Sequence, residues 1–128
     1  MVDKTVIIGV PKSGKTTYAL AHHEKDQIVH TDELLDVEGL KWEDRSQVIV
    51  DLMIARKVFC VEGCDAVRGL RKFMVQNPKT RPCDHVVWMG RSREELSKGQ
   101  TSFGKGCKRI FDDILGELHG LGIMVTIM

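Results

Sequence analysis

Two glycines, a lysine and a hydroxyl side chain stand at the spacing G-x-x-x-x-G-K-[ST] in the stretch GVPKSGKT, from Gly9 to Thr16. In this Walker A pattern the glycines let successive backbone amides point at phosphate oxygens. Lys15 then supplies a positive charge to the β- and γ-phosphates, and the hydroxyl of Thr16 is offered to Mg²⁺. The pattern predicts a loop that holds the phosphates of a nucleotide. The predicted loop residues are Gly9, Val10, Pro11, Lys12, Ser13, Gly14, Lys15, Thr16 and Thr17.

Two carboxylates are candidates for chemistry at those phosphates. Glu62 stands at the end of the predicted strand in VFCVEG, and Asp32 ends QIVHTD. Because the carboxyl ends of parallel strands face the ligand crevice, Glu62 is expected to hold Mg²⁺ or to position a reacting group. The alternative for Glu62 is a charged strand end. Asp32 is a candidate for the general base that accepts the proton of an attacking hydroxyl. The alternative is that it is the N-cap of a helix starting near Glu33, and the two roles are compatible. Asp36 is a weaker candidate for the base.

The polar segment 91–105, RSREELSKGQTSFGK, is interrupted by glycines and is expected to be mobile. Phosphoryl transfer uses cations that neutralise charge on the moving phosphate. Arg91 and Arg93 are the main candidates for that role, and Lys98 and Lys105 are further ones. The segment is where a lid would close over the nucleotide, unless its charges only face solvent.

Positive charge is concentrated in residues 66–109, which hold eleven Lys or Arg against three Asp or Glu, a net charge of +8. Such an excess favours a polyanionic partner, although solvated helix faces are the alternative. Arg68, Arg71 and Lys72 share one face of a predicted helix. Basic groups near an aromatic ring suit a stacked base and its phosphates, unless the ring is part of the core. The predicted acceptor-binding residues are Asp32, Arg68, Arg71, Lys72, Phe103 and Lys105.

Apolar runs and helical periodicities alternate along the chain and would position these residues. Strands are predicted at 5–10, 27–32, 58–63, 85–90 and 122–128. Helices are predicted at 16–24, 43–57, 65–76 and 108–119, while 33–42 is ambiguous. This alternation predicts an α/β protein with a parallel sheet covered on both faces, built as a single domain over residues 1–128.

The composition is that of a globular protein, with 42% hydrophobic and 29% charged residues. No apolar run has the length of a membrane helix, and the N-terminus lacks the features of a signal peptide. The four cysteines form no C-x-x-C pair, and Cys60 is expected in the core. We therefore expect no membrane contact and a cytoplasmic location, in the host cytoplasm if the protein is viral.

Four stretches together resemble the P-loop kinases of the nucleotide and polynucleotide kinase group: GVPKSGKTT, HTDELL, VEGCDAVRG and GRSREE. The small size and VEGCDAVRG are most similar to the phage 5-hydroxymethyluracil DNA kinases, which are related to thymidylate kinases. The resemblance implies a three-layer P-loop NTPase sandwich with strand order 2-3-1-4-5. It also implies that Gly9 to Thr16 bind ATP with Mg²⁺, and that the basic segment 68–109 faces DNA.

The function expected from the residues and the resemblance is transfer of the γ-phosphate of ATP to a hydroxyl on DNA. The resemblance names that hydroxyl as the hydroxymethyl group of 5-hydroxymethyluracil, in a DNA modification that leads to hypermodified thymidine. The alternatives are a polynucleotide 5′-hydroxyl kinase, a kinase for free nucleosides or nucleotides, and a nucleotide-dependent switch or ATPase subunit. The residues leave open the acceptor hydroxyl, ATP against GTP, and the oligomeric state.

Overall fold

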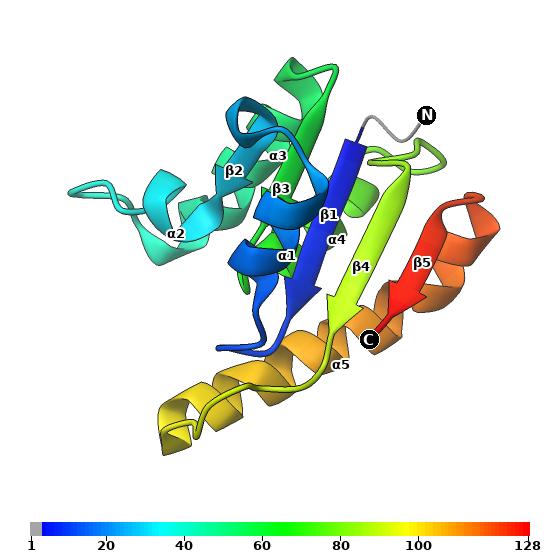
Figure 1. The fold of residues 1–128 in the computed structure, drawn as a ribbon. Helices are drawn as coiled ribbons and strands as arrows, with labels where there is room; N and C mark the ends of the chain where they lie inside the picture. The colour runs from blue at the N-terminus through cyan, green and yellow to red at the C-terminus, as the bar shows by residue number, and fades with distance from the viewer. Residues whose placement is uncertain (1–3) are drawn as a thin grey trace.

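Five parallel strands form one sheet in the computed structural model, which describes residues 4–128 without the side chain of Trp42 (Figure 1). The strands are β1 (Lys4–Gly9), β2 (Ile28–His30), β3 (Phe59–Glu62), β4 (His85–Met89) and β5 (Met124–Ile127). Their order across the sheet is β2-β3-β1-β4-β5, and every neighbouring pair is parallel. The predicted α/β class and strand order are therefore confirmed.

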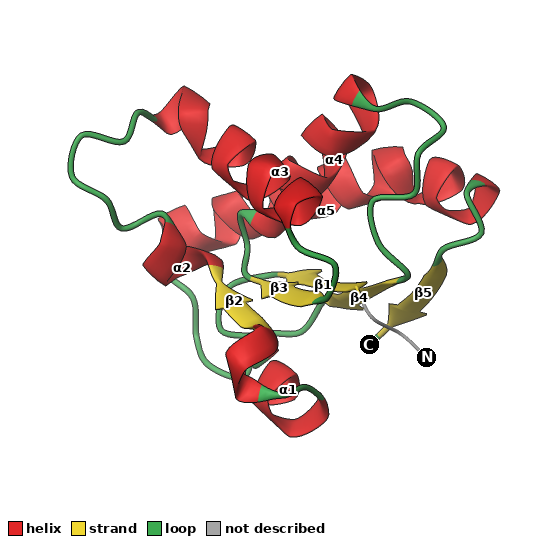
Figure 2. Ribbon diagram, turned by 90° about the horizontal axis from the view of Figure 1, so that it is seen from above, coloured by secondary structure: helices red, strands yellow, loops and turns green. Residues whose placement is uncertain are grey.

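Helices cover both faces of the sheet (Figure 2). They are α1 (Lys15–His22), α2 (Thr31–Leu34), α3 (Arg45–Ala55), α4 (Ala66–Gln76) and α5 (Lys98–Gly120), with 3-10 turns η1 (Lys25–Gln27) and η2 (Trp42–Asp44). One face carries α1, whereas α3, α4 and α5 lie on the other. The sheet thus lies between two helical layers, and the phosphate-loop pattern falls between β1 and α1.

The larger apolar core lies between the sheet and α3, α4 and α5. Phe59 and Phe111 are fully buried there, and Trp88 of β4 stacks on Phe111 of α5 with ring centroids 4.8 Å apart. Burying one such side chain stabilises the fold by roughly 1.5–3 kcal/mol, so this stack fixes α5 against β4. Cys60 is buried in the smaller cluster that contacts α1, as expected, and burial raises its pKa to about 12.

Helix α5 begins at Lys98, well before the predicted start of its helix at 108–119. A capping box starts it: Ser97 Oγ accepts a bond from the backbone N of Gln100 at 3.1 Å. In return, Gln100 Oε1 accepts one from the backbone N of Ser97 at 3.0 Å. This reciprocal pair satisfies two backbone donors at the helix start. The local polar pair therefore outweighs the glycines that made this segment look irregular.

Residues 98–105, the second half of the segment expected to be mobile, are therefore helical. One of the glycines, Gly104, faces the loop that follows β1. A Cβ at Gly104 would stand 3.2 Å from Cδ of Pro11 and 3.3 Å from Cγ1 of Val10. The absence of a side chain lets the first turns of α5 pack closely against that loop.

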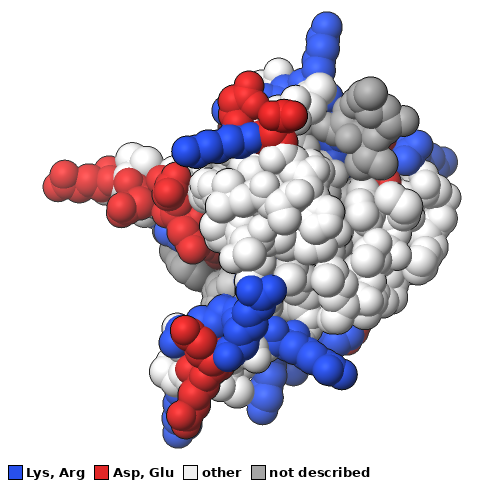
Figure 3. All heavy atoms as spheres, viewed as in Figure 1, with Lys and Arg blue, Asp and Glu red and all other residues white. Residues whose placement is uncertain are grey.

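Charged side chains lie at the rim of the face drawn in Figure 3, which has the view of Figure 1. Acidic side chains gather over the segment around α2, and both signs of charge lie over the chain that leads into α5. The middle of this face, over the strands, is uncharged. Within residues 4–128, no helix combines the length and the apolar character needed to cross a membrane.

Candidate phosphate-binding site

The loop between β1 and α1 borders an open cavity of about 470 Å³. Loop residues 11–17 line it, and Asp32, Glu62 and Arg93 line it from other elements. Lys12 and Gly14 have φ angles of 57° and 92°, so the chain turns sharply through the left-handed region before α1 begins. One cavity therefore brings together the loop, two carboxylates and a guanidinium that are far apart in the sequence.

Lys15 is 7% exposed and its ammonium group is held by the loop itself. Nζ donates to the carbonyl oxygen of Val10 at 2.6 Å, to Oγ of Ser13 at 3.2 Å and to the carbonyl oxygen of Gly9 at 3.5 Å. A buried ammonium group is stable only when its hydrogens are paired. Phosphate oxygens in the cavity would be stronger partners than these neutral acceptors, because ionic hydrogen bonds are about twice as strong.

Gly9 is required where β1 passes β4. A Cβ there would stand 2.1 Å from the carbonyl oxygen of Met89, which also accepts a hydrogen bond from the backbone N of Val10 at 3.1 Å.

We expect Gly9→Ala to lower the free energy of unfolding in urea by about 2–3 kcal/mol, as for severe overpacking. The control is Gly116→Ala in α5, where a Cβ meets nothing within 4 Å. It should raise that free energy by about 0.5–1 kcal/mol. Equal stability of Gly9→Ala and the wild type would contradict the close approach.

Glu62 is 4% exposed at the end of β3 and connects the loop to β2. Its Oε2 accepts a hydrogen bond from Thr16 Oγ1 at 2.7 Å and another from His30 Nδ1 at 2.5 Å. Glu62 therefore does more than end a strand with a charge. It also stands next to the hydroxyl that the Walker A pattern assigns to Mg²⁺.

The donor chemistry of Thr16 and Glu62 fits Mg²⁺, which prefers oxygen ligands. Mg²⁺ is usually bound by one or two carboxylates together with waters and substrate phosphates. In residues 4–128, no group of three or more His, Cys, Asp or Glu side chains is placed to hold a metal ion. The phosphates of a nucleotide would have to complete the shell of an ion at this site.

Asp32 is exposed in the first turn of α2 and lines the cavity. Because α2 begins at Thr31 and its N-cap residue is His30, the prediction that Asp32 caps a helix starting near Glu33 is wrong. Asp36 follows α2, is exposed and does not line the cavity. Of the two candidates for the base, only Asp32 is therefore placed at the phosphate loop.

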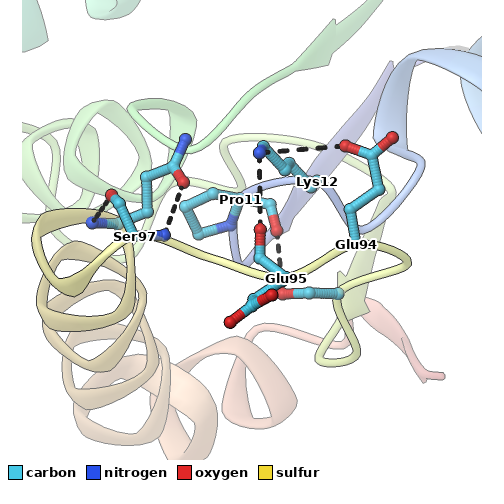
Figure 4. Close-up of polar contacts among 7 residues, drawn as sticks. Pro11, Lys12, Glu94, Glu95 and Ser97 are labelled. Atoms are coloured by element: carbon cyan, nitrogen blue, oxygen red, sulfur yellow. Dashed lines mark hydrogen bonds and ion pairs between the residues drawn. The ribbon is translucent and has the colours of Figure 1, made fainter.

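The chain between β4 and α5 is attached to the phosphate loop (Figure 4). Ser92 Oγ donates to the carbonyl oxygen of Pro11 at 2.9 Å. The backbone N of Arg93 donates to the carbonyl oxygen of Lys12 at 2.7 Å. In the other direction, Nζ of Lys12 donates to the carbonyl oxygen of Glu95 at 3.4 Å. These bonds hold the first half of the expected lid against the loop.

Arg93 is the predicted cation that the structure brings to the cavity. Its guanidinium lies beside Gly14, where a Cβ would stand 2.6 Å from Cζ of the arginine. Arg91 and Lys98 are exposed and do not line the cavity. Lys105 lines a separate cavity of about 350 Å³ beside α5.

The predicted basic helix face lines a groove of about 410 Å³, to which both α3 and α4 contribute. Arg68, Arg71 and Lys72 come from α4, and Arg45 comes from α3. Arg45 pairs with Asp65, the N-cap residue of α4, with Nη2 and Oδ2 2.9 Å apart. None of the acidic side chains in residues 4–128 forms an ion pair with the three basic residues of α4.

Phe103 is half-buried against the larger core and is not a free stacking platform. The guanidinium carbon of Arg68 lies 4.9 Å from the centre of its ring, at cation–π distance. Nη1 of the same arginine lies 3.6 Å from Sγ of Cys107. The ring therefore supports Arg68, which itself reaches the basic groove.

Sequence reasoning missed three residues: Cys64 lines the cavity, Arg45 lines the groove, and His30 contacts Glu62 behind the cavity lining. The thiol of Cys64 lines the cavity; burial raises its pKa, and nearby Lys15 partly offsets this by lowering it. His30 stands two residues before Asp32, and Cys64 stands two after Glu62. Proximity to the strand ends was the available signal. No pattern in the sequence marks Arg45 as a partner of α4.

Comparison with known proteins gives one partial similarity. No family model matches the chain. A cysteine–tRNA ligase of Encephalitozoon cuniculi is 30% identical over an alignment of 109 residues, which covers 77% of this chain and 22% of the ligase. The chain thus spans about a fifth of the length of that enzyme, and the similarity does not place it in the ligase family.

These findings correct the resemblance stated from the sequence. The relative is a ligase, and nothing supports membership in the nucleotide and polynucleotide kinase group or similarity to the phage 5-hydroxymethyluracil DNA kinases. The motifs that suggested those families are short, except for the phosphate-loop pattern. What this chain does has to be argued from the residues at the cavity.

Proposed function

We propose that the protein is a Mg²⁺-dependent phosphotransferase that moves the γ-phosphate of ATP to a hydroxyl of a nucleic acid. One observation carries the proposal: the phosphate loop with Lys15, two carboxylates and Arg93 line a single cavity. A nucleotide-binding loop alone would suit any nucleotide-dependent protein. The additional carboxylate and guanidinium are the groups that phosphoryl transfer to a hydroxyl requires.

Each residue has a role in this transfer. The acceptor oxygen forms a bond to the γ-phosphorus, the bond from that phosphorus to the β,γ-bridging oxygen breaks, and ADP leaves. Asp32 takes the proton of the acceptor hydroxyl. Lys15 and Arg93 neutralise the charge that develops on the phosphate oxygens. Mg²⁺ held by Thr16 and Glu62 would add positive charge at the β- and γ-phosphates.

The acceptor side of the proposal rests on the basic groove. Asp65 lines the groove and its neighbour Cys64 lines the cavity, so the two sites adjoin at the start of α4. Unpaired cations in a groove attract a chain of phosphates, and the attraction falls as salt rises. A nucleic acid strand that the groove binds by its phosphate backbone could present a hydroxyl at the adjoining cavity.

The test is transfer of labelled γ-phosphate from ATP to a matched set of acceptors. The set contains DNA and RNA with 5′-hydroxyl ends, the same strands with blocked ends, and free nucleosides and nucleotides. We expect label in a polymer, with one ADP formed for each phosphate transferred. Label only in monomers would move the acceptor to free nucleosides or nucleotides. ADP without a labelled acceptor would favour a switch or ATPase, and unchanged ATP would contradict the proposal.

The similarity to a cysteine–tRNA ligase favours a second candidate, in which the chain acts on tRNA. The nucleotide products distinguish the two candidate reactions. Phosphoryl transfer leaves ADP, whereas activation of a carboxylate as an adenylate releases pyrophosphate and leaves AMP. Because an adenylate forms only on a carboxylate, adding both cysteine and tRNA to the assay and separating the nucleotides decides between the two candidates in the same experiment.

The groove is tested by the double variant Arg71→Ala, Lys72→Ala. Removing two phosphate contacts should weaken binding to a single strand and lower its logarithmic salt slope by about 1.4, at about 0.7 per contact. The matched control is Arg56→Ala, Lys57→Ala, an exposed pair just after α3 that lines neither the groove nor the cavity. Equal salt slopes for the two double variants would remove the groove from the proposal.

A further inference from the structure

His30 is a polar group that the proposed transfer does not use, although it contacts the site. In the parallel pairing of β2 and β3, His30 stands opposite Glu62. Residues opposite each other in neighbouring strands project on the same face of the sheet. The histidine side chain is 24% exposed and the glutamate side chain is 6% exposed, so the contact is shielded from bulk water.

The contact fixes where the imidazole carries hydrogen. Glu62 Oε2 accepts from His30 Nδ1 at 2.5 Å and from Thr16 Oγ1 at 2.7 Å. An ionised carboxylate can only accept, so Nδ1 must hold the hydrogen of this bond. The Thr16 hydroxyl can donate to Glu62 and still offer a lone pair to a cation.

The two donors come from different kinds of element. Thr16 lies in the first turn of α1, directly after the phosphate loop, whereas His30 is the last residue of β2 and is held by the sheet. Loss of the histidine would leave a nearly buried carboxylate with one donor, Thr16 at the start of α1. A carboxylate oriented by two donors is held in a single position, which the approach of a cation requires.

We propose that His30 is a positioning residue, which holds the Glu62 carboxylate in the orientation that receives the Mg²⁺ of a bound nucleotide. The inference rests on the proposed binding of ATP with Mg²⁺. It adds that the gain in ATP affinity from Mg²⁺ depends on a residue of β2 that does not itself line the cavity.

The test is calorimetric titration with ATP, in EDTA and in Mg²⁺, of the wild type, His30→Ala and His30→Asn. In His30→Ala the gain in affinity from Mg²⁺ should fall by about tenfold, as for loss of an outer-shell partner of a ligand. Affinity in EDTA should not change. His30→Asn places an amide nitrogen near the position of Nδ1 and should keep the gain within about threefold of the wild type.

The outcomes separate this inference from the proposed function. A wild type that binds no ATP would overturn both. Equal gains in His30→Ala and the wild type, or an equal loss in EDTA and in Mg²⁺, would overturn the role of His30 alone. A second measurement needs no variant and no nucleotide: nitrogen NMR of the free protein should find the His30 hydrogen on Nδ1. A neutral ring with its hydrogen on Nε2 alone would overturn the inference.

Discussion

Lys15→Ala is expected to lower kcat/KM for phosphoryl transfer by at least about a thousandfold, or about 4 kcal/mol of transition-state stabilisation. The ammonium group is inside the loop, where three loop acceptors lie within 3.5 Å of it. Charge increases on the phosphate oxygens as the bond to ADP breaks, so a buried cation acts more strongly on the transition state than on bound ATP. The measurement is steady-state transfer to the acceptor that the wild type labels.

A loss of activity could also come from collapse of the loop, since Lys15 bonds to three of its residues. Lys15→Met separates the two causes, because it keeps most of the buried side chain and removes the charge. We expect Lys15→Met to unfold near the urea midpoint of the wild type and to be as inactive as Lys15→Ala. Near-normal turnover in either variant would mean that the loop does not hold the reacting phosphates.

The fold was predictable where local patterns agree with the tertiary structure. The apolar β-branched runs that end at Gly9 and Glu62 are strands, and their alternation with helices gave a parallel sheet. The order of the strands came from a resemblance whose family assignment proved wrong. It nevertheless matches the structure, since a phosphate loop after the first strand is compatible with the same crossover arrangement in proteins of different function.

Helix α5 and the contacts of Glu62 show where prediction from sequence stopped. Gly99, Gly104 and Gly106 looked like loop residues, because glycine costs about 1 kcal/mol in a helix relative to alanine. One of them is explained by close packing against Pro11 and Val10, which is a tertiary fact. The bond from His30 to Glu62 depends on strand register, and a one-residue slip would turn the histidine to the other face.

The early start of α5 was missed for a related reason. Polar composition was taken as a sign of mobility, but polar side chains also make specific bonds. Ser92 and Lys12 join the segment to the loop, and Ser97 starts a helix. Arg93, whose guanidinium lies beside Gly14, is therefore held close to the loop between β1 and α1. If the segment moves on nucleotide binding, it has to break those bonds.

Asp32→Asn is expected to lower kcat by about a hundredfold or more while ATP binding is retained, the size of a lost general base. The asparagine keeps the shape of the side chain but cannot take a proton from the acceptor hydroxyl. Asp32 is exposed and lies in a helix of only four residues, so the substitution should hardly change stability. The measurements are single-turnover transfer and calorimetric ATP affinity of the same preparation.

Asp36→Asn is the matched control, because it makes the same chemical change on an exposed aspartate that does not line the cavity. Its kcat should stay within about twofold of the wild type, as for a surface substitution. If Asp32→Asn also stays in that range, the carboxylate does not take the proton. Glu62 cannot simply replace it, because Oε2 already accepts two hydrogen bonds and the carboxylate is nearly buried. The attacking oxygen would then lose its proton directly to the phosphate or to water, and the protein would act by positioning and charge alone.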